Sequence, residues 1–485
     1  MKRFLRLSLL CSSLWIASCD VVNLDPISSL TESNFYKTAD DMDRAVLGVY
    51  NRYQQRLPRD WSLFDMPTDQ LYMSAYRFIG GLEAVKNLDF QAQNDMFSSF
   101  WQVTYNGVFR ANMVLNKLDV PTDYTTGKKE QFEGEARFMR ALFYFDLVRS
   151  FGGVPKVEGP LSVDQSKAVP RASEKEIYDL IVADLKRAVE ILPLQNKIAY
   201  GRASKGAALA LLGKVYVYQK DWQNALTTLD QITGMGYDLL PEYADLWKES
   251  NEDNKETVFA MKYISGSNGQ RLSLDFLPYF GVEGVSNSTG GEVALVAWSL
   301  HKKFAKEDSR KAATITEYWR SPGTNNAPEW KPFVSKFMAQ TASASGLDIP
   351  VIRYAEVILL RSEALYRLDR KEEALTELNK VRSRAFKGIS KNYVAADIAD
   401  PEKFLDVLLL ERELEFALEN QRWFDLVRTG RFEKELAQQE WGYNPVTQTA
   451  HQVTLTPKPF LRYFPIPQNE IDQSNQGVIK QNDGY

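Results

Sequence analysis

Few residues of this chain have the types and spacing that enzymatic chemistry requires. Histidine, the commonest general base, occurs only at His301 and His451, which are poor material for a catalytic triad or a metal site. The sequence contains no zinc-protease, serine-hydrolase, phosphate-loop, dinucleotide-binding or EF-hand motif. A lone histidine in a polar segment is usually a surface residue, and we expect this here. Paired glycosidase carboxylates are recognised by distance in space, so a glycan hydrolase remains an alternative.

An acidic pair on one predicted helix comes nearest to an acid/base site. Glu411 and Glu415 have i, i+4 spacing and share a helix face, but nearby arginines would hold both ionised. An unpaired buried charge is costly, so we interpret the charges within these apolar helices as a paired, partly buried network. Its predicted members are Arg353, Glu356, Glu411, Arg412, Glu415 and Arg428.

Rings and polar side chains suited to a sugar gather in two segments, 61–94 and 264–350. Sugars present flat C–H faces, which aromatic rings can stack on, and hydroxyls, which Asn, Asp, Arg and Gln can bond. On a helix, Tyr72 and Tyr76 would share one face. We expect one or both segments to form an aromatic shelf for a neutral or weakly charged oligosaccharide. The candidate contacts are Asp69, Tyr72, Tyr76, Arg77 and Asn94 in the first segment, and Tyr279, Phe280 and Trp319 in the second.

Helical periodicity dominates the elements that must position these residues. Ser173 and Glu176 form a capping-box pattern, and Asp400-Pro401 is typical of a helix start. The run 152–155, Gly-Gly-Val-Pro, is a stop signal. Trp101 and Trp423 lie on strongly periodic segments, so we assign both to the core. The fold class is therefore mainly α.

Two stretches have the pattern of a tetratricopeptide helix pair, although any two amphipathic helices in a hairpin remain an alternative. Small residues in such a pair let its helices approach closely. The first stretch carries Leu212, Gly213, Tyr216, Ala225 and Leu229, and the second carries Ser362, Leu365, Ala374, Leu378 and Val381. Residues 264–350 between them are rich in Gly, Ser, Asn, Thr and Pro, with isolated aromatics that include Trp298 and Trp330. Long loops are usually functional, so we expect the site there.

The amino-terminal segment has the form of a bacterial lipoprotein signal. A basic start and an apolar run too short to span a bilayer precede Ile16-Ala17-Ser18-Cys19, which has the pattern of a lipobox. Cys19 would receive the lipid, and Cys11 would leave with the signal, so no disulfide is possible. Without the three basic residues of the signal, the formal charge falls from −4 to −7, which argues against nucleic acid as a partner.

Several longer strings resemble the SusD/RagB family, the surface nutrient-binding lipoproteins of Bacteroidetes. The resemblance covers the whole mature chain, and the ordered co-occurrence of the strings is far more specific than any one of them. They lie at 135–141 (EARFMRA), 151–155 (FGGVP), 254–260 (NKETVFA), 353–356 (RYAE), 411–416 (ERELEF), 422–428 (RWFDLVR), 464–467 (FPIP) and 482–485 (NDGY).

The resemblance implies a scaffold of tetratricopeptide-like helix pairs with a loop-rich second part. It implies that the protein is not an enzyme, needs no cofactor and acts on the outer face of the outer membrane. There it would capture oligosaccharides and deliver them to a SusC-like TonB-dependent barrel. No family motif transfers a binding residue onto a numbered position. Peptide capture of the RagB type and a purely structural tetratricopeptide adaptor remain alternatives.

These expectations divide the chain into five parts. We predict a signal peptide over 1–18, a lipid tether over 19–34 and an N-terminal helical scaffold over 35–263. A loop-rich insertion then covers 264–350, and a C-terminal helical part covers 351–485.

Overall fold

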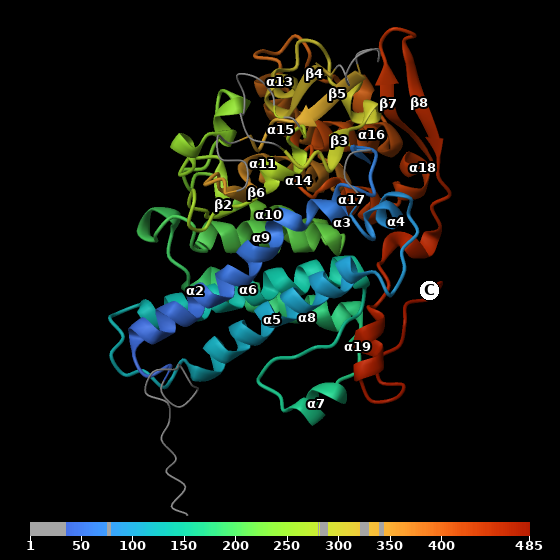
Figure 1. Cartoon of the computed structure of the whole chain (residues 1–485). Coiled ribbons are helices and arrows are strands. Elements are labelled where there is room, and N and C mark those ends of the chain that lie inside the picture. Colours follow the sequence, from blue (N-terminus) through green and yellow to red (C-terminus); the bar gives the residue numbers. More distant parts are fainter. Residues whose placement is uncertain (1–34, 75–78, 280, 282–289, 321–328, 339–343) are drawn as a thin grey trace, which may run out of the picture.

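A stack of antiparallel helix pairs supports a cap of short strands and loops (Figure 1). The computed structural model describes residues 35–74, 79–279, 281, 290–320, 329–338 and 344–485. Cys19, Tyr76, Arg77 and Phe280 lie outside these ranges. The scaffold helices are α2 (Ala39–Arg56), α5 (Asp95–Lys117), α6 (Lys128–Phe151), α8 (Glu174–Ile191), α9 (Lys205–Tyr218), α10 (Trp222–Asp230), α14 (Tyr354–Arg367) and α15 (Lys371–Ala385).

The two predicted tetratricopeptide-like hairpins are α9–α10 and α14–α15, and both form. A Cβ atom at Gly213 would stand 2.4 Å from the Leu229 side chain, so any larger residue there would displace this buried leucine between α9 and α10. Ser362 takes the equivalent place in α14 and donates a hydrogen bond of 2.7 Å to the Ala374 carbonyl. Helix α14 packs on α9 and α10, so the hairpins lie side by side although the sequence separates them widely. The expected mainly α scaffold of helix pairs is confirmed.

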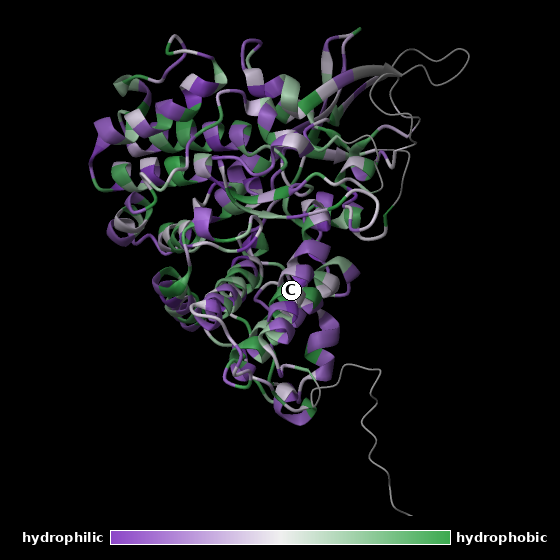
Figure 2. Ribbon diagram, turned by 90° about the vertical axis from the view of Figure 1, so that its left-hand side faces the viewer, coloured by the Kyte–Doolittle hydropathy of each residue, from purple (hydrophilic) through white to green (hydrophobic). Residues whose placement is uncertain are grey.

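Helix ends follow the sequence signals closely. Ser173 and Glu176 form the capping box of α8, and Asp400 accepts hydrogen bonds from two amides at the start of α16. Helix α6 ends at Phe151, directly before the Gly-Gly-Val-Pro stop. Across the described ranges, no helix is both long enough and apolar enough to cross a membrane, and Figure 2 shows hydrophilic and hydrophobic residues mixed along the helices. The remaining C-terminal helices are α16 (Pro401–Glu415), α17 (Arg422–Arg428), α18 (Phe432–Leu436) and α19 (Gln468–Gln473).

The cap is built from four two-stranded antiparallel ladders, β1–β3, β2–β6, β4–β5 and β7–β8. The β2–β6 ladder pairs Met261 with Ile349, so the segment between them leaves the scaffold and returns at one place. The strands are β1 (Leu71–Met73), β2 (Thr257–Met261), β3 (Ala294–Val296), β4 (Ile315–Arg320), β5 (Glu329–Val334), β6 (Ile349–Arg353), β7 (Gln438–Asn444) and β8 (Thr449–Thr454). The short helices are α3 (Trp61–Phe64), α4 (Leu82–Lys86), α7 (Val163–Lys167), α11 (Leu272–Phe276), α12 (Trp298–His301) and α13 (Ser309–Thr314). Single 3₁₀ turns are η1 (Leu57–Arg59), η2 (Gln195–Lys197), η3 (Tyr243–Trp247), η4 (Glu249–Asn251), η5 (Ala395–Ile398) and η6 (Pro459–Arg462).

The predicted network of paired charges is confirmed and lies deep in the protein. Glu415 is 0 % exposed and accepts hydrogen bonds from Arg353 at 2.8 Å, Arg384 at 2.6 Å and Arg310 at 3.3 Å. Burial alone would raise the pKa of Glu415, but these arginines hold it well below its usual range. A carboxylate held ionised in this way cannot act as a general acid, so the structural interpretation of the Glu411–Glu415 pair is the better one.

A second buried network joins the segment 68–86 to the C-terminal helix α17 and to strand β7. The Asp69 carboxylate bonds Arg422 through both oxygens, at 3.0 and 2.9 Å, and accepts a 2.7 Å bond from Lys303. Nearby, the Lys86 ammonium donates to the Thr68 carbonyl and to Gln439 Oε1, both at 2.7 Å. Burial lowers the pKa of Lys86 to about 7, against the opposing charge of Asp69.

We predict that Arg412→Ala lowers the free energy of unfolding by about 3–5 kcal/mol. Arg412 is 2 % exposed and donates a 2.7 Å bond to Asp425, and its loss leaves buried carboxylates short of a partner. Denaturant unfolding measures this change. Arg44→Ala is the matched control, because the Arg44–Asp40 pair is exposed and contributes little. If Arg412→Ala unfolded like the wild type and lost only ligand affinity, the structural role would be wrong.

A second prediction concerns pH. The pKa of Lys86 is about 7 in the folded chain, and an unfolded lysine keeps its proton up to roughly pH 10.4. Between these values the unfolded state binds more protons, so this lysine makes the free energy of unfolding rise with pH. Lys86→Met should remove a slope of up to about 1.4 kcal/mol per pH unit, measured by denaturant unfolding between about pH 7.5 and pH 9.5. Lys129→Met, at an exposed position, should leave the slope unchanged. Equal slopes in the wild type and Lys86→Met would contradict the assignment.

Candidate functional site

The two segments predicted to carry the site meet within the cap, where strand β1 of the first pairs with strand β3 of the second. Strand β1 pairs with β3, which sets Tyr72 opposite Leu295, and the amide of Ser74 continues this pairing to the Val293 carbonyl. The expected helix around Tyr72 is wrong, because Tyr72 lies in a strand. Residues 71–73 form backbone hydrogen bonds with β3, and this pairing with a distant strand, which the local i, i+4 spacing cannot report, makes the segment extended.

Glu292 links the two segments through its side chain, and the sequence analysis missed it. Its carboxylate is 0 % exposed, accepts a 3.0 Å bond from the Ser74 hydroxyl, and accepts a 2.9 Å bond from the Tyr279 amide. The Lys331 ammonium lies 3.6 Å away. Glu292 has a φ of +41°, a strained backbone for a residue with a side chain. Such strain is typical of functional sites, and no local sequence pattern reports it.

An aromatic stack stands beside this linkage. Trp298 lies parallel to Tyr443, with ring centroids 3.8 Å apart, and also to His301 at 4.7 Å. The edge of Trp330 packs against Trp298 at 5.4 Å. A flat ring has two faces, and Trp298 uses both of them inside the protein. Trp298 is therefore a support of the site and offers no face for stacking a sugar.

Glu317 joins two rings of the stack, Trp330 and His301, through its carboxylate. It accepts a 3.0 Å bond from Trp330 Nε1 and pairs with His301 Nε2. His301 is 6 % exposed, so the expected surface position is wrong for this histidine, while His451 is exposed. Burial lowers the pKa of His301 in spite of Glu317. The imidazole is thus a neutral packing group at neutral pH.

Half-exposed rings lie next to the stack. We define the aromatic face as Tyr72 of β1 with Trp441 and Tyr443 of β7, all half-buried. A Cβ atom at Gly442 would lie 3.8 Å from the Tyr72 hydroxyl, so these two strands adjoin. Trp441 is positioned from within, because its indole donates a 2.9 Å bond to Gln439 Oε1. Tyr279, 43 % exposed, stands nearby on the segment joined through Glu292.

Two of the predicted polar contacts have other roles. Asp69 is 3 % exposed, and Arg422 and Lys303 engage both of its oxygens, which holds its pKa far below the usual range although burial opposes this. Asn94 caps helix α5 by accepting from the Met96 amide and donates to the Gly81 carbonyl. Asp69 and Asn94 therefore have structural roles and are not part of the candidate site. The register of β4 sets Trp319 opposite Trp330, but its side chain lies outside the described part of the structure.

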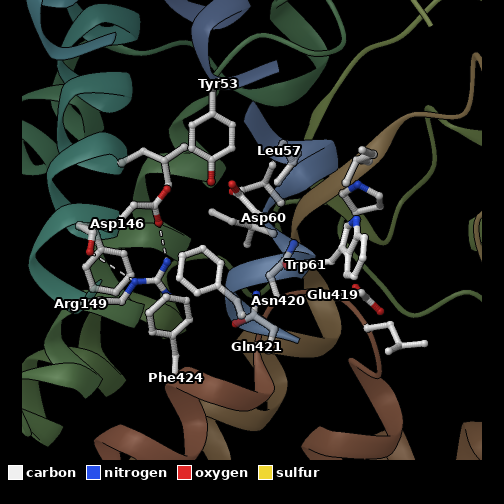
Figure 3. Close-up of a pocket in the computed structure, with 18 of the residues that line it drawn as sticks. Tyr53, Leu57, Asp60, Trp61, Asp146, Arg149, Glu419, Asn420, Gln421 and Phe424 are labelled. Atoms are coloured by element: carbon white, nitrogen blue, oxygen red, sulfur yellow. Dashed lines mark hydrogen bonds and ion pairs between the residues drawn. The ribbon is translucent and has the colours of Figure 1, made fainter. Parts of the chain in front are cut away.

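A small internal cavity lies between the scaffold and the cap. It has a volume of about 50 Å³ and lies between Tyr53, Asp60, Trp61, Arg149 and Asn420 (Figure 3). Ligand pockets usually measure about 300–1,000 Å³. The cavity therefore has room for a few water molecules and none for a sugar ring.

Metal chemistry finds no support in the part of the chain that the structure describes. No three His, Cys, Asp or Glu side chains are grouped there as metal ligands. The carboxylates near the aromatic face, Glu292 and Glu317, are taken up by hydrogen-bond donors. The arrangement is suited to stacking and to hydrogen bonding.

The sequence is similar to known proteins over most of its length. A family model described as "SusD family" matches residues 321–485, and one described as "Starch-binding associating with outer membrane" matches residues 26–217. The SusD-like protein P38 of Formosa agariphila is 26 % identical, over 89 % of this chain and 93 % of its own length.

Solved structures share the fold. A SusD-like protein from Bacteroides fragilis superposes with a TM-score of 0.79 at 23 % identity, covering 94 % of this chain and 99 % of that one. A laminarin-binding SusD-like protein superposes with a TM-score of 0.77 at 25 % identity, covering 93 % of this chain and all of the other. The family resemblance of the sequence strings is confirmed, and the chain belongs to the SusD/RagB family.

Proposed function

We propose that this protein is a non-enzymatic, lipid-anchored protein of the outer cell surface that captures an oligosaccharide and delivers it to a SusC-like TonB-dependent barrel. The observation that carries the proposal is the aromatic face, whose rings stand half-exposed over a packed aromatic stack. Rings held in this way lose little freedom on binding, and sugars stack on them through their C–H faces.

The comparisons support a glycan as the ligand class. One solved relative is described as binding laminarin, and one matching family model is described as starch-binding. A hydrolase is the weaker alternative, because the carboxylates beside the aromatic face are bonded by Ser74, Tyr279 and Trp330. Peptide capture of the RagB type would be preferred if no glycan bound.

We expect alanine at Tyr72, Tyr279, Trp441 or Tyr443 to weaken glycan binding by about 1–2 kcal/mol, roughly tenfold, because each change removes a stacking ring. Calorimetric titration with oligosaccharides from laminarin and from starch measures the effect. The affinity should depend little on salt, because stacking and neutral hydrogen bonds are not screened.

Phe109→Ala is the matched control for these variants. Phe109 is a half-exposed ring on α5, in the scaffold below the cap, and its loss should leave affinity unchanged. Tyr443→Phe should retain most of the affinity, because it keeps the ring stacked on Trp298. Unchanged affinity in all four alanine variants would remove the aromatic face as the site, and absence of glycan binding in the wild type would refute the ligand class.

The anchor is tested separately. Cys19→Ala should abolish acylation and release the protein from membranes, since the thiol at the end of the lipobox receives the lipid. Fractionation and mass spectrometry of the amino terminus measure this change. On intact cells, the wild type should be cleaved by added protease. Complete protection would contradict surface display, and failure to co-purify any TonB-dependent barrel would contradict the delivery step.

A further inference from the structure

A groove of about 790 Å³ lies between α2–α3, the start of α5, and α11, outside the aromatic face. Partly exposed aliphatic side chains line it, namely Ile79, Met96 and Val103. Trp61 and Phe100 form its floor, each 3 % exposed. A concave, mostly apolar surface of this volume with a few charged groups is typical of a small-molecule site.

Two arginines converge at one end of the groove around a single carboxylate. Asp275 is 5 % exposed, and its Oδ1 accepts from Arg271 Nε at 3.1 Å and from Arg271 Nη2 at 2.9 Å. Burial raises the pKa of Asp275. The charges of Arg271 and Arg59 oppose this rise, so Arg59 also lies near enough to act on the same carboxylate. Among the described residues, the Arg59 guanidinium has no hydrogen-bond or ion-pair partner. This end therefore carries one net positive charge with free donors.

The other charges of the groove leave that excess in place. On the floor, Asp60 is paired with Arg56 at 3.2 Å, and Arg56 and Arg149 together balance the charges of Asp60 and Asp146. Asp95 is exposed in the first turn of α5, where a negative charge stabilises the helix, and it is not among the charges that act on Asp275. Asp60 and Trp61 line both this groove and the internal cavity, where Figure 3 shows them.

We propose that this groove binds an organic carboxylate with an apolar body, with the carboxylate between Arg59 and Arg271 and the body against Met96, Val103 and Ile79. Guanidinium groups bind carboxylates through paired N–H donors, which gives both charge and geometry. The aliphatic wall supplies the affinity that an exposed ion pair alone lacks. The proposal does not depend on glycan binding at the aromatic face.

The test uses three fluorinated probes of one shape, followed by ¹⁹F NMR line broadening on the full mature chain. 4-Fluorobenzoate should bind more tightly than neutral 4-fluorobenzamide, and 4-fluorobenzamidine should bind most weakly. Arg59→Gln should weaken 4-fluorobenzoate by about tenfold or more and leave 4-fluorobenzamide unchanged, because it removes a charged hydrogen bond. Arg44→Gln is the matched control, because Arg44 of α2 is exposed and does not line the groove, and it should change neither.

Ser99→Trp locates the binding. Ser99 is exposed and lines the groove, so a large ring there should exclude all three probes without disturbing the core. Binding that survives Ser99→Trp, or an order in which 4-fluorobenzamidine binds most tightly, would overturn the proposal.

Two further ligands separate the sources of such a carboxylate. N-acetyl-leucine imitates the free end of an apolar peptide, and glucuronate imitates an acidic sugar. The aliphatic wall predicts tighter binding of N-acetyl-leucine, and equal or tighter binding of glucuronate would overturn the apolar part of the assignment. Affinity for 4-fluorobenzoate should fall with added salt, whereas glycan affinity at the aromatic face should not. Failure of one site is thus distinguishable from failure of the other.

Discussion

The rest of the structure depends on the pairing of Glu415 with three arginines from distant parts of the chain. Arg310 comes from α13 in the cap, Arg353 from the end of β6, and Arg384 from the second hairpin. Arg353 also bonds Glu256, directly before β2, at 2.9 Å. One carboxylate thus joins the cap to both strands of the ladder at which the cap departs. Each of these charges is tolerable inside the protein only because the others are there, so the cap and the scaffold share one buried charge network.

The second network extends this constraint to the candidate site. Asp69 stands two residues before β1, and its bonds to Arg422 and Lys303 tie that strand to α17 and to the segment after α12. Strand β1 carries Tyr72 of the aromatic face, and α12, just before Lys303, carries the Trp298 support. Asp69, which the sequence predicts as a ligand contact, therefore helps to position Tyr72. Its burial, and not its chemistry, decides between the two roles.

Aromatic residues divide in the same way between support and surface. Trp298 and Trp330 pack against each other. Trp330 also packs against His301 and donates a hydrogen bond to Glu317, so these side chains form a base beneath the exposed rings. Tyr443 has one face on that base and lies in the strand that also carries Trp441. The division follows from packing, because a ring flanked on both sides cannot stack on a ligand. The groove beside α11 shows a different division, with aliphatic walls and a charged end.

The sequence by itself determined the helices, their ends and the family. The periodicity of α5, α8 and α16, the capping residues Ser173 and Asp400, and the close approach at Gly213 are local, and local interactions suffice to produce them. The paired charges were also foreseen, because burial of an unpaired charge is costly whatever the fold. Only the tertiary structure decided which residues form the site. Tyr72 became part of a strand through a partner more than two hundred residues away, and Asp69 and Asn94 were taken up by neighbours. Glu292 and Tyr443 gained their places through contacts between segments that no local pattern records, since such contacts exist only once the chain has folded.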